Sequence, residues 1–407
     1  MSEWKKLKLG DICIIGDGAH ASLKRQKEGI LYITAKNLSE NGLVLSNADY
    51  ISHETYNQYF KDNSKALTKP RKNDILYSII GSIGGCYLIK DEVLGVSSSV
   101  AIFRCKDAIN PMYLFYYLKS DEFKNEIDAI KGGVAQGFMS LSKIGSVAVT
   151  LPPLSTQHRI ATFLSRYDSL IENYQKQIKL LEEAAQRLYK EWFVDLRFPG
   201  HETTKIVDGV PEGWEKKTIA DVCTNIYSGS TPSRSNKAYW DNGTIKWVKT
   251  KELQDGWILD TEEYISQEGY NSSSTKMFPA NTILMAIYAS PTLGRLGILS
   301  TDCCCNQAAL GLIADENIIS WQWLFWKLYE LRDEFNAIAR GAGQQNISGI
   351  VVKNKEIIIP NKGVIDGFTS VVSKMFEQQK SLSSQLRLLT EARDRLLPKL
   401  MSGEITV

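Results

Sequence analysis

The chain has 407 residues, of which 43% are hydrophobic and 23% are charged, and its formal net charge is +2. This is the composition of an ordinary globular protein with room for roughly two to four domains. No apolar run reaches the roughly 18 residues that a membrane-spanning helix needs, and the N-terminus lacks the apolar core of a secretion signal. We therefore expect a cytoplasmic protein without a membrane span. The near-neutral charge gives only weak support to nucleic-acid binding, which favours strongly basic surfaces.

The sequence is duplicated, and the second copy begins about 210 residues after the first. Residues 4–13, WKKLKLGDIC, reappear as residues 214–223, WEKKTIADVC, with Trp, Asp and Cys at the same spacing. Residues 49–52, DYIS, reappear as residues 263–266, EYIS. An internal repeat of this length predicts two copies of one structural unit, and it suits a protein that grips two places.

The first copy, residues 1–154, is predicted to form a mixed α/β head. Short apolar and β-branched runs bounded by Gly, Asn and Asp predict strands. Residues 111–118 predict a helix that begins with Pro111 at its first position. The runs predicted to be strands are residues 31–34, 75–80, 86–89, 100–103 and 147–151.

A long helix is predicted over residues 155–198, with Ser155 or Thr156 as its N-cap. Its apolar residues recur at alternating intervals of four and three, which is the seam of a left-handed coiled coil. The helix runs for roughly 38 of these residues, so at 1.5 Å per residue it would extend about 57 Å, roughly one and a half turns of B-DNA. The seam residues are Ile160, Leu164, Tyr167, Ile171, Tyr174, Ile178, Leu181, Ala185, Leu188 and Trp192.

A second head is expected over residues 199–361, and a second long helix with a C-terminal tail over residues 362–407. The second seam is less pure, because Gln379 and Arg393 occupy seam positions, where polar side chains set the register of a coiled coil. Each seam has three candidate partners: the other seam, its own head, or a second chain. The second seam is Phe368, Val372, Met375, Gln379, Leu382, Leu386, Leu389, Arg393 and Leu396.

Together these patterns predict an α/β (α+β) protein. We expect two mixed α/β heads in a pseudo-twofold arrangement, joined by two long helices. The duplication favours pairing of the two seams within the chain, as an antiparallel coiled coil, over the other two partners.

No catalytic constellation is present in the sequence. It lacks a Gly-x-x-x-x-Gly-Lys-Ser/Thr phosphate loop, a His-Glu-x-x-His motif and a Gly-x-Ser-x-Gly elbow. The four histidines are scattered, and the other copy preserves none of them. The run Cys303-Cys304-Cys305 has no partner pair at ligand spacing, so a metal site is not expected there. We therefore expect a non-catalytic chain that binds neither a metal nor a cofactor.

Polar loops lie at equivalent places in the two copies and carry the candidate DNA-binding residues. Lys, Arg, Asn and Gln are the side chains that read base edges, and Gly lets backbone approach phosphates. The surrounding frame repeats while the loop residues differ, as expected of two readers of two different half-sites. For any one of these residues the alternative is an ordinary exposed polar side chain. The candidates are His20, Lys24, Arg25, Lys36, Asn37, Lys131 and Gln136 in the first copy, and Ser230, Thr231, Arg234, Lys249, Thr250, Lys251, Arg295, Arg340, Gln344, Gln345 and Asn346 in the second.

Over essentially its whole length the chain resembles the specificity subunits of type I restriction–modification systems. Each motif is loose, and their ordered duplication is what makes the resemblance specific. The motifs are the strand starts at Trp4 and Trp214, the segments 36–38 and 251–253, the turn 344–348 (QQNIS), the helix entry 151–160 (LPPLSTQHRI) and the helix ends 180–184 (LLEEA) and 388–392 (LLTEA).

The resemblance implies that each head is a target recognition domain that reads one half of a bipartite site in double-stranded DNA. It implies that the helix pair is a ruler for the unspecified spacer and a docking surface for two methyltransferase subunits, which restriction subunits join. S-adenosylmethionine, ATP and Mg would belong to those partner subunits and not to this chain.

Two other functions make different predictions. A fused restriction–modification enzyme would carry a methyltransferase motif and a nuclease carboxylate cluster, and the sequence has neither. A structural or protein-interaction tether with duplicated heads would have no affinity for DNA. Basic loops with Gln and Asn at matched positions argue against the tether.

Overall fold

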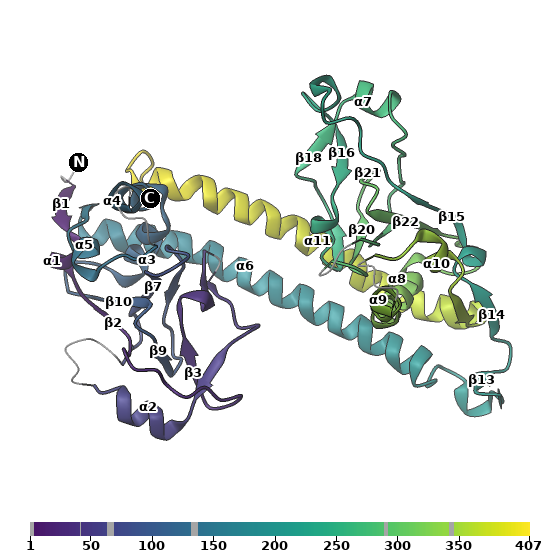
Figure 1. The fold of residues 1–407 in the computed structure, drawn as a ribbon, viewed down its shortest axis with the longest axis horizontal. Helices are drawn as coiled ribbons and strands as arrows, with labels where there is room; N and C mark the ends of the chain where they lie inside the picture. Colours follow the sequence, from purple (N-terminus) through teal and green to yellow (C-terminus); the bar gives the residue numbers. More distant parts are fainter. Residues whose placement is uncertain (1–3, 41, 63–68, 132–136, 289–291, 342–345) are drawn as a thin grey trace. The chain divides into compact units, whose positions relative to one another are not determined.

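The computed structural model describes residues 4–40, 42–62, 69–131, 137–288, 292–341 and 346–407 (Figure 1). The chain divides into two compact units: unit 1 is Met1–Ile171 with Leu389–Val407, and unit 2 is Glu172–Leu388. Each unit contains one head and a part of each of two long helices. None of the described helices is long and apolar enough to cross a membrane.

The head of unit 1 is built on an antiparallel sheet and a smaller mixed sheet. Aromatic side chains from the larger sheet and from the helices beside it fill the core, where the rings of Tyr77 and Phe103 meet edge to face at 6.0 Å. The larger sheet has the order β2 (Cys13–Asp17), β10 (Val100–Cys105), β7 (Ile75–Ser78) and β8 (Cys86–Leu88), and the smaller has the order β6 (Asp49–Ile51), β3 (Ile30–Ile33) and β9 (Leu94–Val96). The other elements are β1 (Lys5–Lys8), α1 (Leu9–Ile12), the 3-10 turn η1 (Ala35–Asn37), β4 (Leu38–Ser39), β5 (Gly42–Leu43), α2 (His53–Tyr59), α3 (Pro111–Lys119), α4 (Asp121–Lys131), α5 (Leu141–Gly145) and β11 (Ala148–Leu151).

Unit 2 repeats this plan with one more strand in its larger sheet. That sheet has the order β15 (Cys223–Ser228), β22 (Ala309–Ala314), β19 (Ile283–Ala286), β20 (Leu296–Leu299) and β17 (Gly256–Ile258), and the smaller has the order β18 (Glu263–Ile265), β16 (Ile245–Val248) and β21 (Cys304–Cys305). The other elements are η3 (His201–Thr203), β12 (Ile206–Val207), β13 (Val210–Pro211), β14 (Glu215–Thr218), η4 (Ala220–Val222), η5 (Lys237–Tyr239), η6 (Thr250–Glu252), α7 (Gln267–Asn271), α8 (Trp321–Glu330), α9 (Arg332–Gly341), α10 (Gly349–Lys353) and β23 (Glu356–Ile359).

The strand pairing reproduces the sequence duplication. β1 pairs antiparallel with β11, and β14 pairs in the same way with β23. In the smaller sheets β3 and β16 each have one antiparallel and one parallel neighbour. The predicted mixture of sheets and helices in duplicated heads is confirmed, and the strands predicted for the first head are present with bounds shifted by one or two residues.

The two long helices are α6 (Leu154–Tyr189), continued by the π-helical turn η2 (Lys190–Val194), and α11 (Lys362–Met401). The first helix was expected to reach residue 198. It ends earlier because Leu196 adopts a left-handed φ of 56°, and because Pro199 keeps the residue before it out of the helical conformation. All the seam residues from Ile160 to Leu188 and from Phe368 to Leu396 are buried or half-buried.

The helices run antiparallel within each unit. In unit 1, Ile160 and Leu164 near the start of α6 share a core with Leu400 near the end of α11. In unit 2, the ring of Tyr189 near the end of α6 lies 6.1 Å from that of Phe368 near the start of α11. The first turns of each helix therefore pack into the core of their own head as well as against the other helix.

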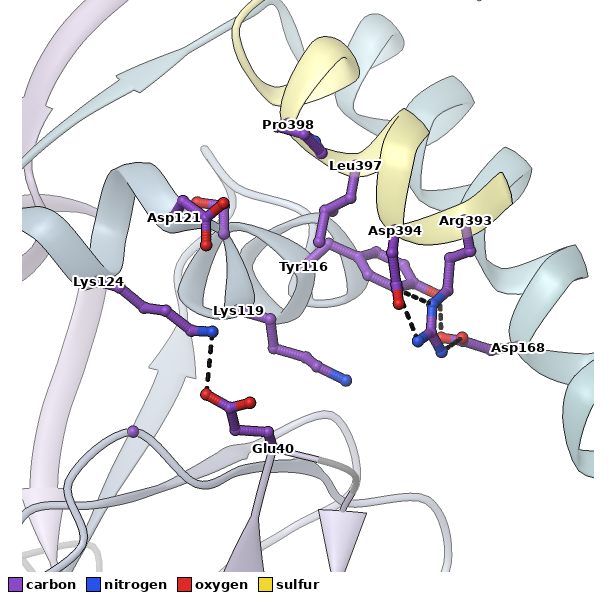
Figure 2. A pocket seen from close by; sticks show the side chains of 12 residues that line it. Glu40, Tyr116, Lys119, Asp121, Lys124, Asp168, Arg393, Asp394, Leu397 and Pro398 are labelled. Atoms are coloured by element: carbon purple, nitrogen blue, oxygen red, sulfur yellow. Dashed lines mark hydrogen bonds and ion pairs between the residues drawn. The ribbon is translucent and has the colours of Figure 1, made fainter. Parts of the chain in front are cut away.

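A polar network joins the two helices to the head in unit 1 (Figure 2). Asp168 of α6 accepts a hydrogen bond from the hydroxyl of Tyr116 of α3 at 2.6 Å and another from Nη1 of Arg393 of α11 at 2.9 Å. Arg393 also pairs with Asp394 at 2.7 Å. The polar seam residue Arg393 thus has a specific partner on the opposite helix, which ties the register of the helices to the position of α3.

Unit 2 fills the equivalent position with apolar side chains. By the repeat, Tyr116, Asp168 and Arg393 correspond to Trp326, Phe376 and Ala185. All three are buried in one core, and the rings of Trp326 and Phe376 lie 6.4 Å apart. The two copies therefore share a backbone plan but join their helices by different chemistry.

Candidate nucleic-acid interface

In unit 1, strands β3 and β6 place an aromatic ring opposite a carboxylate, because Tyr32 and Asp49 are register partners. Arg25 lies over the ring of Tyr32, with its Cζ 4.0 Å from the ring centroid. Nε of Arg25 is 3.5 Å from Oδ2 of Asp49, and Nζ of Lys36 is 3.1 Å from the same oxygen. We call Arg25, Tyr32, Lys36 and Asp49 cluster 1.

Unit 2 has the same arrangement on β16 and β18, where Trp247 and Glu263 are register partners (Figure 1). Arg234 lies over two rings, with its Cζ 3.6 Å from the centroid of Trp240 and 4.9 Å from that of Trp247. Its Nη2 is 2.6 Å from Oε2 of Glu263, and Nζ of Lys249 is 2.7 Å from Oε1 of the same carboxylate.

A second carboxylate extends this group, because Glu262 pairs with Lys249 at 3.1 Å and with Lys251 at 2.5 Å. We call Arg234, Trp240, Trp247, Lys249, Lys251, Glu262 and Glu263 cluster 2.

The charged side chains of both clusters are partly exposed, and each cluster carries one more cation than anion. Cluster 1 has two basic side chains and one carboxylate, and cluster 2 has three basic side chains and two carboxylates. The side chains of Arg25 and Arg234 are 37% and 51% exposed. Burial raises the pKa of Glu263, but the bonds from Lys249 and Arg234 outweigh it, so the pKa lies below its ordinary value. The ion pairs and the aromatic faces thus hold the basic side chains of each cluster in place.

Asn37 does not belong to this surface, and the expectation that it contacts bases is wrong. Its side chain is 1% exposed. Its Oδ1 accepts from the backbone N–H of Thr34 at 3.0 Å, and its Nδ2 donates to the carbonyl of Val44 at 3.2 Å. Glu252 has the equivalent role in unit 2, where its carboxylate accepts from the backbone N–H of Lys249 at 2.6 Å. Both residues cap the 3-10 turn that follows the aromatic strand.

Two loop glycines, Gly18 and Gly229, also have a structural role. A Cβ on Gly18 would lie 1.9 Å from the carbonyl oxygen of Val96, and one on Gly229 would lie 2.0 Å from that of Cys305. The residue after each glycine donates its N–H to that same carbonyl, at 2.7 Å in unit 1 and 2.9 Å in unit 2. The glycines therefore let this loop pair closely with β9 and β21.

Residues 1–183 and 211–382 match the family model described as the type I restriction modification DNA specificity domain. The chain belongs to this family. It is 27% identical to the type I restriction enzyme MjaIX specificity subunit of Methanocaldococcus jannaschii, over all of this chain and 94% of that one. It is 28% identical to the type I restriction enzyme HindI specificity subunit of Haemophilus influenzae, over the whole of both chains.

The fold agrees with this membership. The crystal structure of the type I restriction–modification system S subunit from M. genitalium covers 98% of this chain and 96% of its own, with a TM-score of 0.65 at 17% identity. The resemblance seen in the sequence is thus confirmed, and the chain is a DNA-specificity subunit and not an enzyme.

The remaining candidates of this specificity subunit lie outside the two clusters or at their edges. His20 is exposed and its Nε2 is 2.9 Å from Oδ2 of Asp17. Ser230 and Thr231 are half-buried, and their hydroxyl groups bond to Ser274 and Gln307. Nε of Arg340 donates to the carbonyl of Asn336 at 3.2 Å. Of the others, Lys24 and Asn346 are exposed, and Thr250 and Arg295 are half-buried.

The side chains of four candidates lie outside the part of the chain that the structure describes. Lys131 is the last residue of α4, and its side chain is outside the described part of the chain. Gln136, Gln344 and Gln345 lie outside the described residues. Within the residues that the structure does describe, no three His, Cys, Asp or Glu side chains are grouped as a metal site.

Sequence reasoning missed the aromatic and acidic members of both clusters. A signal for the carboxylates was present, because Asp49 and Glu263 begin the matched segments DYIS and EYIS. Their importance depends on the strand register that places them opposite Tyr32 and Trp247, which the sequence does not state. The missed residues are Tyr32, Asp49, Trp240, Trp247, Glu262 and Glu263.

Proposed function

We propose that this specificity subunit directs a type I restriction–modification complex to a two-part target in double-stranded DNA, with one head on each part. The observation that carries the proposal is the pair of matched clusters. The two clusters sit on equivalent strands in the same register, yet their aromatic, basic and acidic residues differ. One frame with two sets of side chains is what two readers of different half-sites require.

The boundaries of the proposed domains follow the sequence prediction. We place the two target recognition domains at residues 1–154 and 199–361, the first spacer helix and the short link after it at residues 155–198, and the second spacer helix with its tail at residues 362–407. α6 has 36 residues, which corresponds to about 54 Å of helix and roughly one and a half turns of B-DNA. A helix pair of this length suits a ruler for the unspecified spacer between the half-sites.

Two methyltransferase subunits are the proposed partners on the helix pair, and restriction subunits join them. S-adenosylmethionine, ATP and Mg belong to these partners, as the resemblance to type I specificity subunits implies. We place the complex in the cytoplasm, where its DNA is. The small excess of positive charge in each cluster implies that the partner subunits supply much of the contact to phosphates.

Co-expression with the methyltransferase subunit encoded beside this chain tests the proposal. Methylated adenines are mapped on genomic DNA with the chain present and with it omitted. We expect a split motif with a constant unspecified gap that disappears when the chain is omitted. Absence of methylation, together with absence of a DNA-dependent mobility shift by the purified complex, would favour the protein-interaction tether instead.

Single arginine variants assign each head to its half-site. Arg25→Ala should relax or abolish the reading of one half only, and Arg234→Ala that of the other. The expected loss is about tenfold to a hundredfold in discrimination at the affected base pair. Arg71→Ala, which removes an exposed arginine of unit 1 outside cluster 1, is the control and should leave the motif intact. The same effect from all three variants would contradict the assignment.

A further inference from the structure

Each cluster contains a carboxylate where a surface built only to grip DNA would have none. Asp49 holds both basic side chains of cluster 1 at one oxygen, with Arg25 at 3.5 Å and Lys36 at 3.1 Å. Glu263 holds Arg234 and Lys249 of cluster 2, one at each of its oxygens. A carboxylate repels phosphate, so its presence at the same register position in both heads asks for a reason.

The neighbours of each arginine weaken the effect of its charge and restrain its position. A paired arginine is nearly neutral toward a distant phosphate, and each of these arginines lies between an aromatic ring and a carboxylate. A guanidinium group has five N–H donors, so one carboxylate leaves others for a second acceptor. A guanidinium group that is partly neutralised and held in place is poorly suited to phosphate and well suited to the acceptor atoms of a base edge.

We propose that Asp49 and Glu263 are positioning residues for base reading. Each neutralises the arginine of its cluster and orients it so that the arginine donates to a base edge and not to the phosphate backbone. This inference rests on the proposed function and adds to it: the acidic residues set the ratio of sequence-specific to non-specific binding. Loss of the carboxylate frees the arginine and lysine for any phosphate, whatever the sequence.

The test uses the full chain in its complex with the methyltransferase subunit. Its affinity is measured for a duplex of random sequence and for a duplex carrying the mapped target, over a series of salt concentrations. Asp49→Asn and Glu263→Gln keep the size of the side chain and remove its charge. Each should raise the affinity for the random duplex by roughly two- to fivefold, the range expected when one exposed ion pair is lost. Each should also make the salt dependence steeper and lower the preference for the target.

Conservative and charge-matched variants separate orientation from simple folding or net charge. Asp49→Glu and Glu263→Asp exchange the residues that the two heads use, so both should keep the preference for the target. Asp91→Asn removes one negative charge from the exposed pair with Lys72 and should leave that preference unchanged. Thermal unfolding of each variant confirms that it is folded.

Two results would overturn the inference without touching the proposed function. One is that Asp49→Asn and Glu263→Gln keep the full preference of the wild type for the target. The other is a loss of target affinity in these variants with no gain on the random duplex, which would make the carboxylates direct base contacts. By contrast, a wild-type complex that binds both duplexes equally would contradict the proposed function itself.

Discussion

Glu182 of α6 is a half-buried carboxylate beside the ion pair of Asp255 and Arg332 in unit 2. Burial raises its pKa, and the negative charges of Asp255 and Glu183 raise it further, against the opposing effect of Lys179 and Arg332. The folded protein therefore holds a proton on Glu182 more firmly than the unfolded chain does. The contribution of this group to stability is fully present below its ordinary pKa of 4.5 and is lost as the pH rises through the folded value.

Replacing Glu182 by Gln should therefore stabilise the protein at neutral pH. The amide removes a charge that the folded state disfavours, and we expect the melting temperature to rise by on the order of 2 °C. Glu377→Gln is the control, since it removes the same charge from an exposed side chain of α11 that does not contribute to the pKa of Glu182. The difference between the two variants should narrow as the pH falls below 4.5. A Glu182→Gln variant that is less stable than wild type at neutral pH would contradict the argument.

The basic residues of the clusters could be predicted from the sequence, but their partners could not. Arg25, Lys36 and Arg234 are recognisable because loops rich in basic residues recur at matched positions. Asn37 was assigned wrongly because the same amide group caps a turn or reads a base, depending only on whether it is buried. A side chain's neighbours follow from strand register, which depends on residues far apart in the chain.

At the level of elements, the heptad pattern predicted both long helices, since their periodicity is local and extends over many turns. Sheet order could not be read in the same way. β3 pairs in parallel with β9, about 60 residues further along the chain, and neither strand is long enough to carry a pairing signal. The polar seam residue Arg393 was a recognisable signal, although its partners Asp168 and Tyr116 were not.

The network of Tyr116, Asp168 and Arg393 can be tested by exchange with its apolar counterpart. Arg393→Ala leaves Asp168 without its cation. We expect the free energy of unfolding to fall by about 2 kcal/mol, a value between those for exposed and for buried ion pairs. The triple variant Tyr116→Trp, Asp168→Phe, Arg393→Ala installs the residue types found in unit 2 and should recover most of that loss. Urea unfolding measures both changes.

The control for this exchange is Arg395→Ala, which removes an exposed arginine of the same helix and should change stability little. A triple variant less stable than Arg393→Ala alone would show that the surroundings in unit 1 require polar side chains. An unchanged Arg393→Ala variant would show that solvent screens the pair fully, since Arg393 and Asp168 are 19% and 25% exposed.

For the whole molecule, the most consequential prediction came from the duplication itself. Two copies of a head and two heptad helices define the architecture before any contact is known, because each copy must bury its own core. What the sequence leaves open is which chemistry joins each head to its helices. The exchange of a polar network in unit 1 for an apolar core in unit 2 shows that one backbone plan accepts both.

If the helix pair is a ruler, lengthening both helices by one heptad should lengthen the spacer. Ile178 of α6 and Ser383 of α11 line the same cavity in unit 2, so insertions after Lys176 and after Gln385 extend neighbouring parts of the pair. A full heptad keeps each seam on its face and adds about 10.5 Å, which corresponds to about three base pairs at 3.4 Å each. Methylation mapping should then show the same half-sites separated by the longer gap.

Seven residues inserted at the Asp208–Gly209 turn lengthen the chain but neither helix, and should leave the gap unchanged. An unchanged gap in the double insertion, with methylation retained, would mean that the spacer is set elsewhere in the complex.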